Sequence, residues 1–463
     1  MADTPISAKD FGASFKGFME QMAREEPAEE PFFRKRLGEH FGSDPSKLAI
    51  VGETLSDANH PNLHLAVEAF VSEAGRTYEL CGVSSDTAAF MGINIAQLVS
   101  TGGRMGGSPP SEGPVTYANV PLDGDRMLAC VQLGLYLVKD GDTRLALLVQ
   151  GKQRHDPTVK VEVLATDRAA ADACLASLRI AMRKRNVYRG HIVSLSAPNQ
   201  MLHVTFHRLP AITREQIILP AGVLERIERQ SVGFAKHAER LHAAGRHLKR
   251  GMLLHGSPGT GKTLTAMYLA GRMPDRTVML ITGRSVGLLE QACAMARALQ
   301  PATIILEDVD LIAEERSRQN AGGCAPLLFE LLNQMDGLAD DADILFVLTT
   351  NRPDLLEPAL AARPGRIDQA VEVPPPDAEC RRRLFELYGR GLRVTAAIEP
   401  FIERTSGASA AFIRELLRKA ALFAADDGGE IEVKAKHFDD ALHEMVVQGG
   451  DLTKRLLGAA IHS

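Results

Sequence analysis

The sequence lacks the features that would place it in a membrane or export it. In its 463 residues no apolar run approaches the ~20 residues that a membrane-spanning helix needs. The first residues, MADTPISAKDFG, lack the basic and then apolar order of a secretion signal. The six cysteines form no C-x-x-C pair, so neither a disulfide framework nor a zinc site is indicated. We therefore expect a cytoplasmic protein without a membrane span.

The chain also lacks a large excess of charge of either sign. Its formal net charge is −5, which gives no general attraction to nucleic acid or to an anionic membrane. The basic run LRIAMRKRNVYRGH, residues 178–191, contains almost no aromatic residue, and we interpret it as a solvated helix end rather than a nucleic-acid contact. The length predicts about two to four domains.

Changes of pattern along the chain predict where these domains lie. Residues 1–99 have a helical or mixed pattern, and residues 100–114 are rich in Gly, Ser and Pro, which predicts a flexible linker. Residues 115–212 contain strand-like runs and one helix, and predict a small α/β domain with a largely antiparallel sheet. From residue 213 onward strands alternate with helices, which is the pattern of a parallel sheet covered by helices.

One glycine-rich segment has the residues and the context needed to bind phosphates. The segment GSPGTGKT follows an apolar strand and precedes a helix, as the G-x-x-x-x-G-K-T motif requires. Its glycines let backbone N–H groups converge on the phosphates, and the helix adds the positive end of its dipole. Lys262 would neutralise the β- and γ-phosphates, and the Thr263 hydroxyl would ligate Mg²⁺. The predicted ATP-binding residues are Gly256, Ser257, Pro258, Gly259, Thr260, Gly261, Lys262, Thr263 and Leu264.

A second apolar run, TIILEDVD, ends in two adjacent carboxylates, Glu307 and Asp308. In a P-loop fold a neighbouring strand carries one acid on the side of the metal and one that polarises the attacking water. By position, Glu307 is the metal-side acid, together with Thr263, and Asp308 is the catalytic acid. The reverse assignment stays open, because adjacent strand residues point to opposite faces unless the strand ends there. Asp310 is a further acid whose role has to come from the structure.

The motifs between residues 213 and 447 resemble, in their order, those of the AAA ATPase module. The strand ILFVLTT ends at Asn351, which matches the family's sensor of the water or the γ-phosphate. Arg363 and Arg366, in ARPGRID, match the arginine fingers that reach into the neighbouring subunit's site. One extra residue precedes Arg363, so Arg366 is the better match. Two segments within residues 376–447 are similar to the family's helical lid.

This resemblance implies a fold, cofactors and partners. The expected fold class is α/β, with a P-loop parallel sheet (213–375), a helical lid (376–447) and a tail (448–463), preceded by a helical segment and a small α/β domain. ATP and Mg²⁺ are the implied cofactors. Fingers that act in trans imply a ring, a homo-hexamer or a heptamer. The implied partner is an unidentified protein substrate bound by residues 1–210.

Two local features refine the resemblance. The Glu-Asp order and the short interval before it are similar to the subgroup of the mitochondrial Rieske-protein translocase, whose membrane helix has no counterpart here. The segment VGL, residues 286–288, stands where other members have an aromatic pore residue. In the lid we interpret Arg414 as a solvated helix charge. We expect an ATP-hydrolysing motor that remodels or translocates proteins. The alternative is a nucleotide-gated scaffold with slow hydrolysis.

Overall fold

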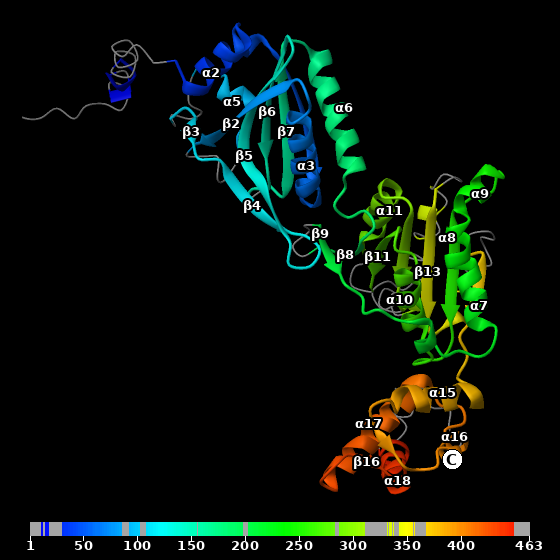
Figure 1. The fold of residues 1–463 in the computed structure, drawn as a ribbon. Helices are drawn as coiled ribbons and strands as arrows, with labels where there is room; N and C mark the ends of the chain where they lie inside the picture. Colours follow the sequence, from blue (N-terminus) through cyan, green and yellow to red (C-terminus); the bar gives the residue numbers. More distant parts are fainter. Residues whose placement is uncertain are drawn as a thin grey trace, which may run out of the picture. The chain divides into compact units, whose positions relative to one another are not determined.

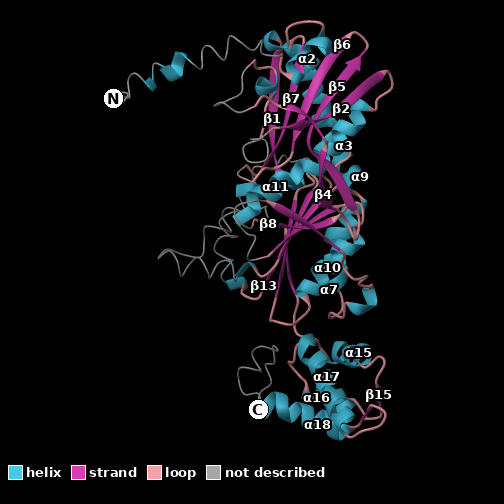
Figure 2. Ribbon diagram, turned by 90° about the vertical axis from the view of Figure 1, so that its left-hand side faces the viewer, coloured by secondary structure: helices cyan, strands magenta, loops and turns pink. Residues whose placement is uncertain are grey.

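The structure, a computed structural model, divides into two compact units. The first consists of Met1–Val120 and Met127–Arg185, and the second of Pro121–Arg126 and Asn186–Ser463 (Figures 1 and 2). Within them the structure describes residues 11–12, 14–17, 30–85, 92–101, 108–154, 156–197, 202–282, 287–310, 331, 333–335, 337, 342–354, 356 and 367–448. No helix in these residues is both long enough and apolar enough to span a bilayer.

A largely antiparallel sheet forms the centre of the first unit. Its strand order is β1-β7-β6-β5-β2-β3, and β4 pairs with β5. Residues of β1 alternate between half-buried and exposed, as expected for a strand with one covered face. The strands are β1 (Ala49–Ser56), β2 (Arg76–Ser84), β3 (Ser111–Gly113), β4 (Thr116–Pro121), β5 (Met127–Asp140), β6 (Thr143–Gln150) and β7 (Thr158–Ala165).

Helices cover both faces of this sheet. On one face, α3 (His60–Val71) and α6 (Arg168–Lys184) contribute to an apolar core with β5, β6 and β7. On the other face, α2 (Phe32–Phe41) and α5 (Ile95–Leu98) form a second core with the opposite sides of the same strands. Two short 3-10 helices, η1 (Pro45–Lys47) and η2 (Asp57–Asn59), flank β1. The central strands β5 and β6 are therefore apolar on both faces, which explains their weak alternation in the sequence.

This arrangement differs from the predicted boundaries in the first half of the chain. We expected residues 1–99 and 115–212 to be separate regions joined by a linker. Instead, β1 pairs with β7 along its whole length, so both regions share one sheet. Moreover, β3 begins at Ser111, inside the expected linker, and pairs with β2. The sequence pattern missed this because it reports local periodicity and not which strands pair.

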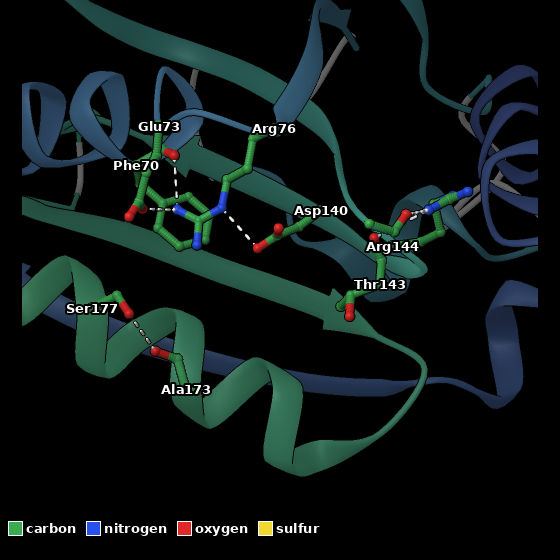
Figure 3. A network of polar contacts seen from close by, with 9 residues as sticks. Phe70, Glu73, Arg76, Asp140, Thr143, Arg144, Ala173 and Ser177 are labelled. Carbon is green, nitrogen blue, oxygen red and sulfur yellow. Dashed lines mark hydrogen bonds and ion pairs between the residues drawn. The ribbon is translucent and has the colours of Figure 1, made fainter.

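A half-buried arginine, Arg76, connects the end of α3 to the β5–β6 hairpin (Figure 3). Arg76 donates from Nε to Asp140 at 2.8 Å and from Nη1 to the Phe70 carbonyl at 2.9 Å. Its Nη1 also donates to Glu73 at 2.5 Å. The guanidinium lies 4.0 Å from the centroid of the Phe70 ring. Because the last carbonyls of a helix lack intrahelical partners, Arg76 satisfies one of them and stabilises this corner.

The second unit contains a mainly parallel sheet in the order β14-β10-β13-β12-β11-β8-β9. All neighbouring pairs are parallel except β8–β9, which is antiparallel. Its strands are β8 (Ile192–Ser196), β9 (His203–His207), β10 (Arg250–His255), β11 (Thr277–Ile281), β12 (Ala302–Leu306), β13 (Ile344–Thr350) and β14 (Gln369–Glu372). Ligands of such sheets bind where the parallel strands end, which is the edge that carries the phosphate loop.

Alternate residues of these strands pack into two different cores. Ile305 and Val347 face the core that contains α7 (Val223–Glu228) and α10 (Lys262–Arg272). Leu306 and Leu348 face the core that contains α11 (Leu289–Ala298). The other short helices of this part are η5 (Arg214–Gln216), the π-helix η6 (Arg229–Gly233), α8 (Phe234–Lys236) and α9 (Ala238–Ala243). Each strand residue can therefore be assigned to the α10 face or to the α11 face.

Two strands of this sheet were expected in the preceding small domain. We assigned β8 and β9 to residues 115–212, but β8 pairs in parallel with β11 and thereby extends the second unit's sheet. Val193 and Leu195 of β8 are buried in the core that contains α11. The periodicity of a strand identifies its buried side chains and not the sheet that buries them, so the sequence could not separate these possibilities.

A helical bundle follows β14. It contains α15 (Ala378–Tyr388), α16 (Glu399–Arg404), α17 (Ala410–Asp426), α18 (Ala435–His443) and the π-helix η8 (Glu444–Gln448), with the short pair β15 (Arg393–Val394) and β16 (Glu432–Val433). Phe412, Leu416 and Phe438 lie in its own apolar core. The predicted fold class, a P-loop α/β sheet followed by a helical lid, is confirmed.

Candidate nucleotide site

The phosphate loop begins where β10 ends, at the C-terminal edge of the sheet. Gly256 has a φ of 149°, and a Cβ at this position would lie 2.3 Å from the carbonyl oxygen of Val373. Gly261, directly before α10, has a φ of 104°, which side chains rarely adopt. The loop backbone therefore depends on glycine at both ends of the turn.

Lys262 lies over this loop. Its side chain is 5% exposed, and Nζ donates to the carbonyl oxygens of Gly256 at 2.9 Å and Ser257 at 2.8 Å. Burial lowers the pKa of Lys262, and the carboxylates of Asp308 and Asp310 oppose this shift. The cation thus lies between the loop and the acids that follow β12.

The two acids follow the last residue of β12, Leu306. Glu307 continues the α10 face of the strand, on which Ile305 lies. Asp308 has a φ of 48°, in the left-handed region. The chain therefore leaves the strand geometry at Asp308. The side chains of Glu307 and Asp308 consequently need not point to opposite faces of the sheet, as neighbouring residues within a strand do.

Glu307 lies beside the first turn of α10. Burial, together with the nearby Asp308 charge, raises the pKa of Glu307, and the neighbouring Thr263 hydroxyl opposes this shift. Its Oε1 atom is buried and has no hydrogen-bond partner among the described residues. A buried carboxylate oxygen without a partner, next to a hydroxyl, is a donor set that suits a hard cation such as Mg²⁺.

A magnesium ion held here would need ligands beyond the protein. In the described part of the chain no group of three or more His, Cys, Asp or Glu side chains is arranged to bind a metal. This fits Mg²⁺, which is usually held by one or two protein oxygens together with waters and substrate phosphates. The residues predicted for the metal, Thr263 and Glu307, fit such an ion.

Asp308 and the end of β13 meet at the same edge. Asn351 donates from Nδ2 to Asp308 Oδ1 at 3.3 Å. Its backbone N–H donates to Oδ1 of Asp310 at 3.1 Å, and the Thr350 hydroxyl donates to the same oxygen at 2.8 Å. Asp310, 4% exposed, accepts both bonds. The structure thus brings the predicted catalytic acid and the predicted sensor residue into contact, and it gives Asp310 a place beneath them.

A cavity of about 570 Å³ connects these groups. Its walls include Pro258, Gly259, Thr260, Gly261, Lys262, Thr263, Leu264, Asp308 and Asn351. The lid reaches the loop directly, because the backbone N–H of Ala411 donates to the carbonyl of Gly259 at 3.1 Å. Of the two acids, Asp308 lines the cavity, whereas Glu307 lies behind it next to Thr263.

The remaining walls were not predicted from the sequence. They come from the segment before β10 and from the lid, and include Gln216, Ile217, Ile218, Leu219, Leu384, Tyr388 and Arg414. We interpreted Arg414 as a solvated helix charge, and it is exposed, but it also lines this cavity. These residues carry no phosphate-binding motif, so only their position in the fold identifies them.

Several predicted positions lie outside the residues that the structure describes. They are both finger candidates, Arg363 and Arg366, together with the tail from residue 449 onward and residue 286 of the VGL segment. Their assigned roles stay predictions.

Comparisons with known proteins agree with this geometry. Residues 252–375 match the family described as "ATPase family associated with various cellular activities (AAA)". The chain is 32% identical over 228 residues to the 26S proteasome regulatory subunit 8 homolog of Schizosaccharomyces pombe. The aligned region covers 46% of this chain and 56% of that protein. It is 31% identical over 224 residues to the proteasome-activating nucleotidase 2 of Halobacterium salinarum, covering 46% of this chain and 54% of that protein.

A third relative is a protease. The chain is 32% identical over 240 residues to the ATP-dependent zinc metalloprotease FtsH of Thermotoga maritima, covering 49% of this chain and 39% of that protein. The chain thus spans 56%, 54% and 39% of these three relatives. The match to the AAA family model is confined to the part around the phosphate loop, residues 252–375, and it agrees with the order of the motifs there.

Proposed function

We propose that the chain binds ATP with Mg²⁺ and hydrolyses it to ADP and phosphate. The observation that carries this proposal is one cavity lined by Lys262, at the start of α10, and by Asp308 and Asn351, which follow β12 and β13. A cation over the phosphate loop, a carboxylate and an amide are the groups that phosphoryl transfer to water requires. The relatives' names, a nucleotidase and an ATP-dependent protease, support the same activity.

Each group has a defined part in this reaction. The backbone of the loop and Lys262 hold the β- and γ-phosphates. Thr263 and Glu307 would hold Mg²⁺, which neutralises charge on the phosphate oxygens. Asn351 and Asp308 orient a water molecule, and the Asp308 carboxylate takes its proton as the water oxygen bonds to the γ-phosphorus and the bond to ADP breaks.

The other end of the cavity suits a nucleoside. Ile217, Ile218 and Leu219 from the segment before β10, with Leu384 and Tyr388 of the lid, supply apolar surface for a base. Because this wall combines the P-loop domain with its lid, a change of nucleotide would be transmitted to the lid.

We further propose that the active form is a ring, a homo-hexamer, in which Arg366 and Arg363 act on the neighbouring subunit's nucleotide. The ring would act on a protein bound by residues 1–210, as a remodelling or translocating motor. The VGL segment, which has no aromatic ring, favours either the alternative of a nucleotide-gated scaffold with slow hydrolysis or a motor that acts on folded proteins. Strong stimulation of turnover by a protein substrate would support the motor. The likeness to the Rieske-protein translocase subgroup and the cytoplasmic location stay predictions.

Replacement of the loop lysine tests the proposal. Lys262→Ala removes the cationic side chain of the phosphate loop, so ATP affinity should be lost. The control is Lys419→Ala, which removes a lysine paired with Glu444 in the lid. Titration with a fluorescent ATP analogue and a phosphate-release assay measure both variants. Tight binding by Lys262→Ala, or no phosphate release by the wild-type chain, would contradict the proposal.

A further inference from the structure

The backbone of Asp308 is in the left-handed conformation, which aspartate adopts more readily than most residues but still only in a minority of cases. It is the only non-glycine residue with a positive φ in the part of the chain that the structure describes. Such a conformation is unfavourable for most side chains and persists where the surroundings impose it. At this position it decides where a carboxylate points.

The hydroxyl of Thr349 supplies that constraint. The backbone N–H of Asp308 donates to Thr349 Oγ1 at 3.0 Å. Thr349 is fully buried, on the β13 face shared with Val347, towards the core that contains α10. It is not among the residues that line the nucleotide cavity. Its contact is therefore with the backbone of the acid and not with the nucleotide.

A regular strand would send the Asp308 side chain elsewhere. Ile304 and Leu306, at alternate positions of β12, pack into the core with α11. If the backbone stayed extended at Asp308, its side chain would point towards the same face as Ile304 and Leu306, away from the cavity. The left-handed turn instead places Asp308 at the cavity wall, with Oδ1 3.3 Å from Asn351 Nδ2.

We propose that Thr349 is a positioning residue for hydrolysis: its hydroxyl oxygen holds Asp308 in the left-handed conformation that directs the carboxylate to the attacking water. This inference rests on the proposed function, since it concerns the acid assigned there. Asp310 holds the end of β13 in a similar way, because its carboxylate accepts hydrogen bonds from the Thr350 hydroxyl and the backbone N–H of Asn351. The two threonines that end β13 thus fix both sides of the Asp308–Asn351 contact.

The test removes the hydroxyl oxygen of Thr349 and keeps the shape of its side chain. Thr349→Val cannot accept the Asp308 N–H, whereas Thr349→Ser can. A misplacement of about 1 Å can reduce turnover about 100-fold, so we expect kcat of Thr349→Val to fall about 10- to 100-fold. KM and the affinity for the fluorescent ATP analogue should stay within about twofold, because Lys262 and Thr263 are untouched. Thr349→Ser should recover most of the turnover.

Thr303→Val is the matched control. Thr303 is fully buried on β12, in the same sheet, and its Oγ1 accepts a hydrogen bond from Arg276 Nε at 3.1 Å. This variant therefore also loses a hydrogen bond accepted by a buried threonine hydroxyl, but near the N-terminal end of β12, away from the phosphate loop, and its kcat should match the wild type. If Thr349→Val does not fold, as judged by its melting temperature, Thr349→Ala removes the acceptor without adding bulk.

The outcomes separate the inference from the proposed function. A wild-type chain that turns over, with an unchanged kcat in Thr349→Val or Thr349→Ala, overturns the role of Thr349 and leaves the ATPase intact. Equal losses in Thr349→Val and Thr303→Val, or no recovery with Thr349→Ser, mean that the hydroxyl only stabilises the fold. A wild-type chain without hydrolysis overturns the proposed function, and the inference with it.

Discussion

The different surroundings of Glu307 and Asp308 predict different defects when each is changed to its amide. Asp308→Asn should bind Mg²⁺ and ATP normally but fail to hydrolyse ATP. Asparagine tolerates the φ of 48° at this position, and its side-chain oxygen can still accept the bond from Asn351. An amide takes no proton from water, and general base catalysis contributes about 10²- to 10⁴-fold, so single-turnover hydrolysis should slow by that factor.

Glu307→Gln should give the opposite result. The buried carboxylate beside Thr263 is the charged protein group available to the metal, and its loss should raise the Mg²⁺ concentration needed for ATP binding by about tenfold or more. At saturating Mg²⁺ the single-turnover rate of hydrolysis should return to the wild-type value, because Asp308 and Asn351 are unchanged.

One pair of assays distinguishes the two acids. A Mg²⁺ titration of ATP binding and a single-turnover measurement are made on both variants and on the wild type. The assignment is reversed if Glu307→Gln traps ATP at the wild-type Mg²⁺ dependence while Asp308→Asn binds weakly. Equal defects in both assays would mean that the carboxylates act as one unit.

Four further predictions concern the ring, the pH dependence, the phosphate loop and helix α10. Arg366→Ala should bind ATP but hydrolyse it slowly, and mixing it with Lys262→Ala should restore some turnover; mixed rings without recovery would argue against action in trans. Because burial and Asp308 raise the pKa of Glu307, protons should compete with Mg²⁺ at a higher pH than for an ordinary glutamate. The Mg²⁺ requirement should therefore begin to rise on acidification at a pH above the range in which an ordinary glutamate titrates, and Asp308→Asn should move this rise to lower pH; identical profiles would show that Asp308 does not influence Glu307. Gly256→Ala should abolish ATP binding, since its Cβ would lie 2.3 Å from the Val373 carbonyl oxygen. Gly271→Ala, in α10 with no atom within 4 Å of the added Cβ, should instead raise the free energy of unfolding by about 0.5–1 kcal/mol in denaturant titrations.

The sequence could point to one end of the cavity, the end lined by the residues predicted to bind phosphate, because these residues are contiguous in the chain. Lys262 and its loop form one motif, and the acids follow one strand. The apolar end could not be predicted in this way. Ile218, Tyr388 and Arg414 lie far apart in the chain and meet only when the lid packs on the loop. No local pattern distinguishes an arginine that lines a cavity from one on a solvated helix.

The domain boundaries predicted for the first half of the chain differ from the structure for a related reason. Periodicity indicated strands in the region of β8 and β9, whereas β1 lies within residues 1–99, which showed a helical or mixed pattern, and strand pairing is a long-range property. β1 belongs with strands more than 100 residues later, and β8 pairs across to β11. Glycine and proline between residues 100 and 114 suggested a break, yet β3 within that stretch adds to the sheet.

The order of the two acids follows from the end of the strand. A strand that stopped later would place Glu307 and Asp308 on opposite faces, and only one could serve the site. Here β12 ends at Leu306, Glu307 keeps the α10 face beside Thr263, and the left-handed turn at Asp308 returns the next carboxylate to the cavity. Aspartate and asparagine adopt this backbone conformation more readily than most residues other than glycine. A glutamate in the second position would be less suited to the turn and would reach about one bond further. The Glu-Asp order therefore suits a site in which the longer acid lies along the strand towards the metal and the shorter acid stands at the turn towards the water.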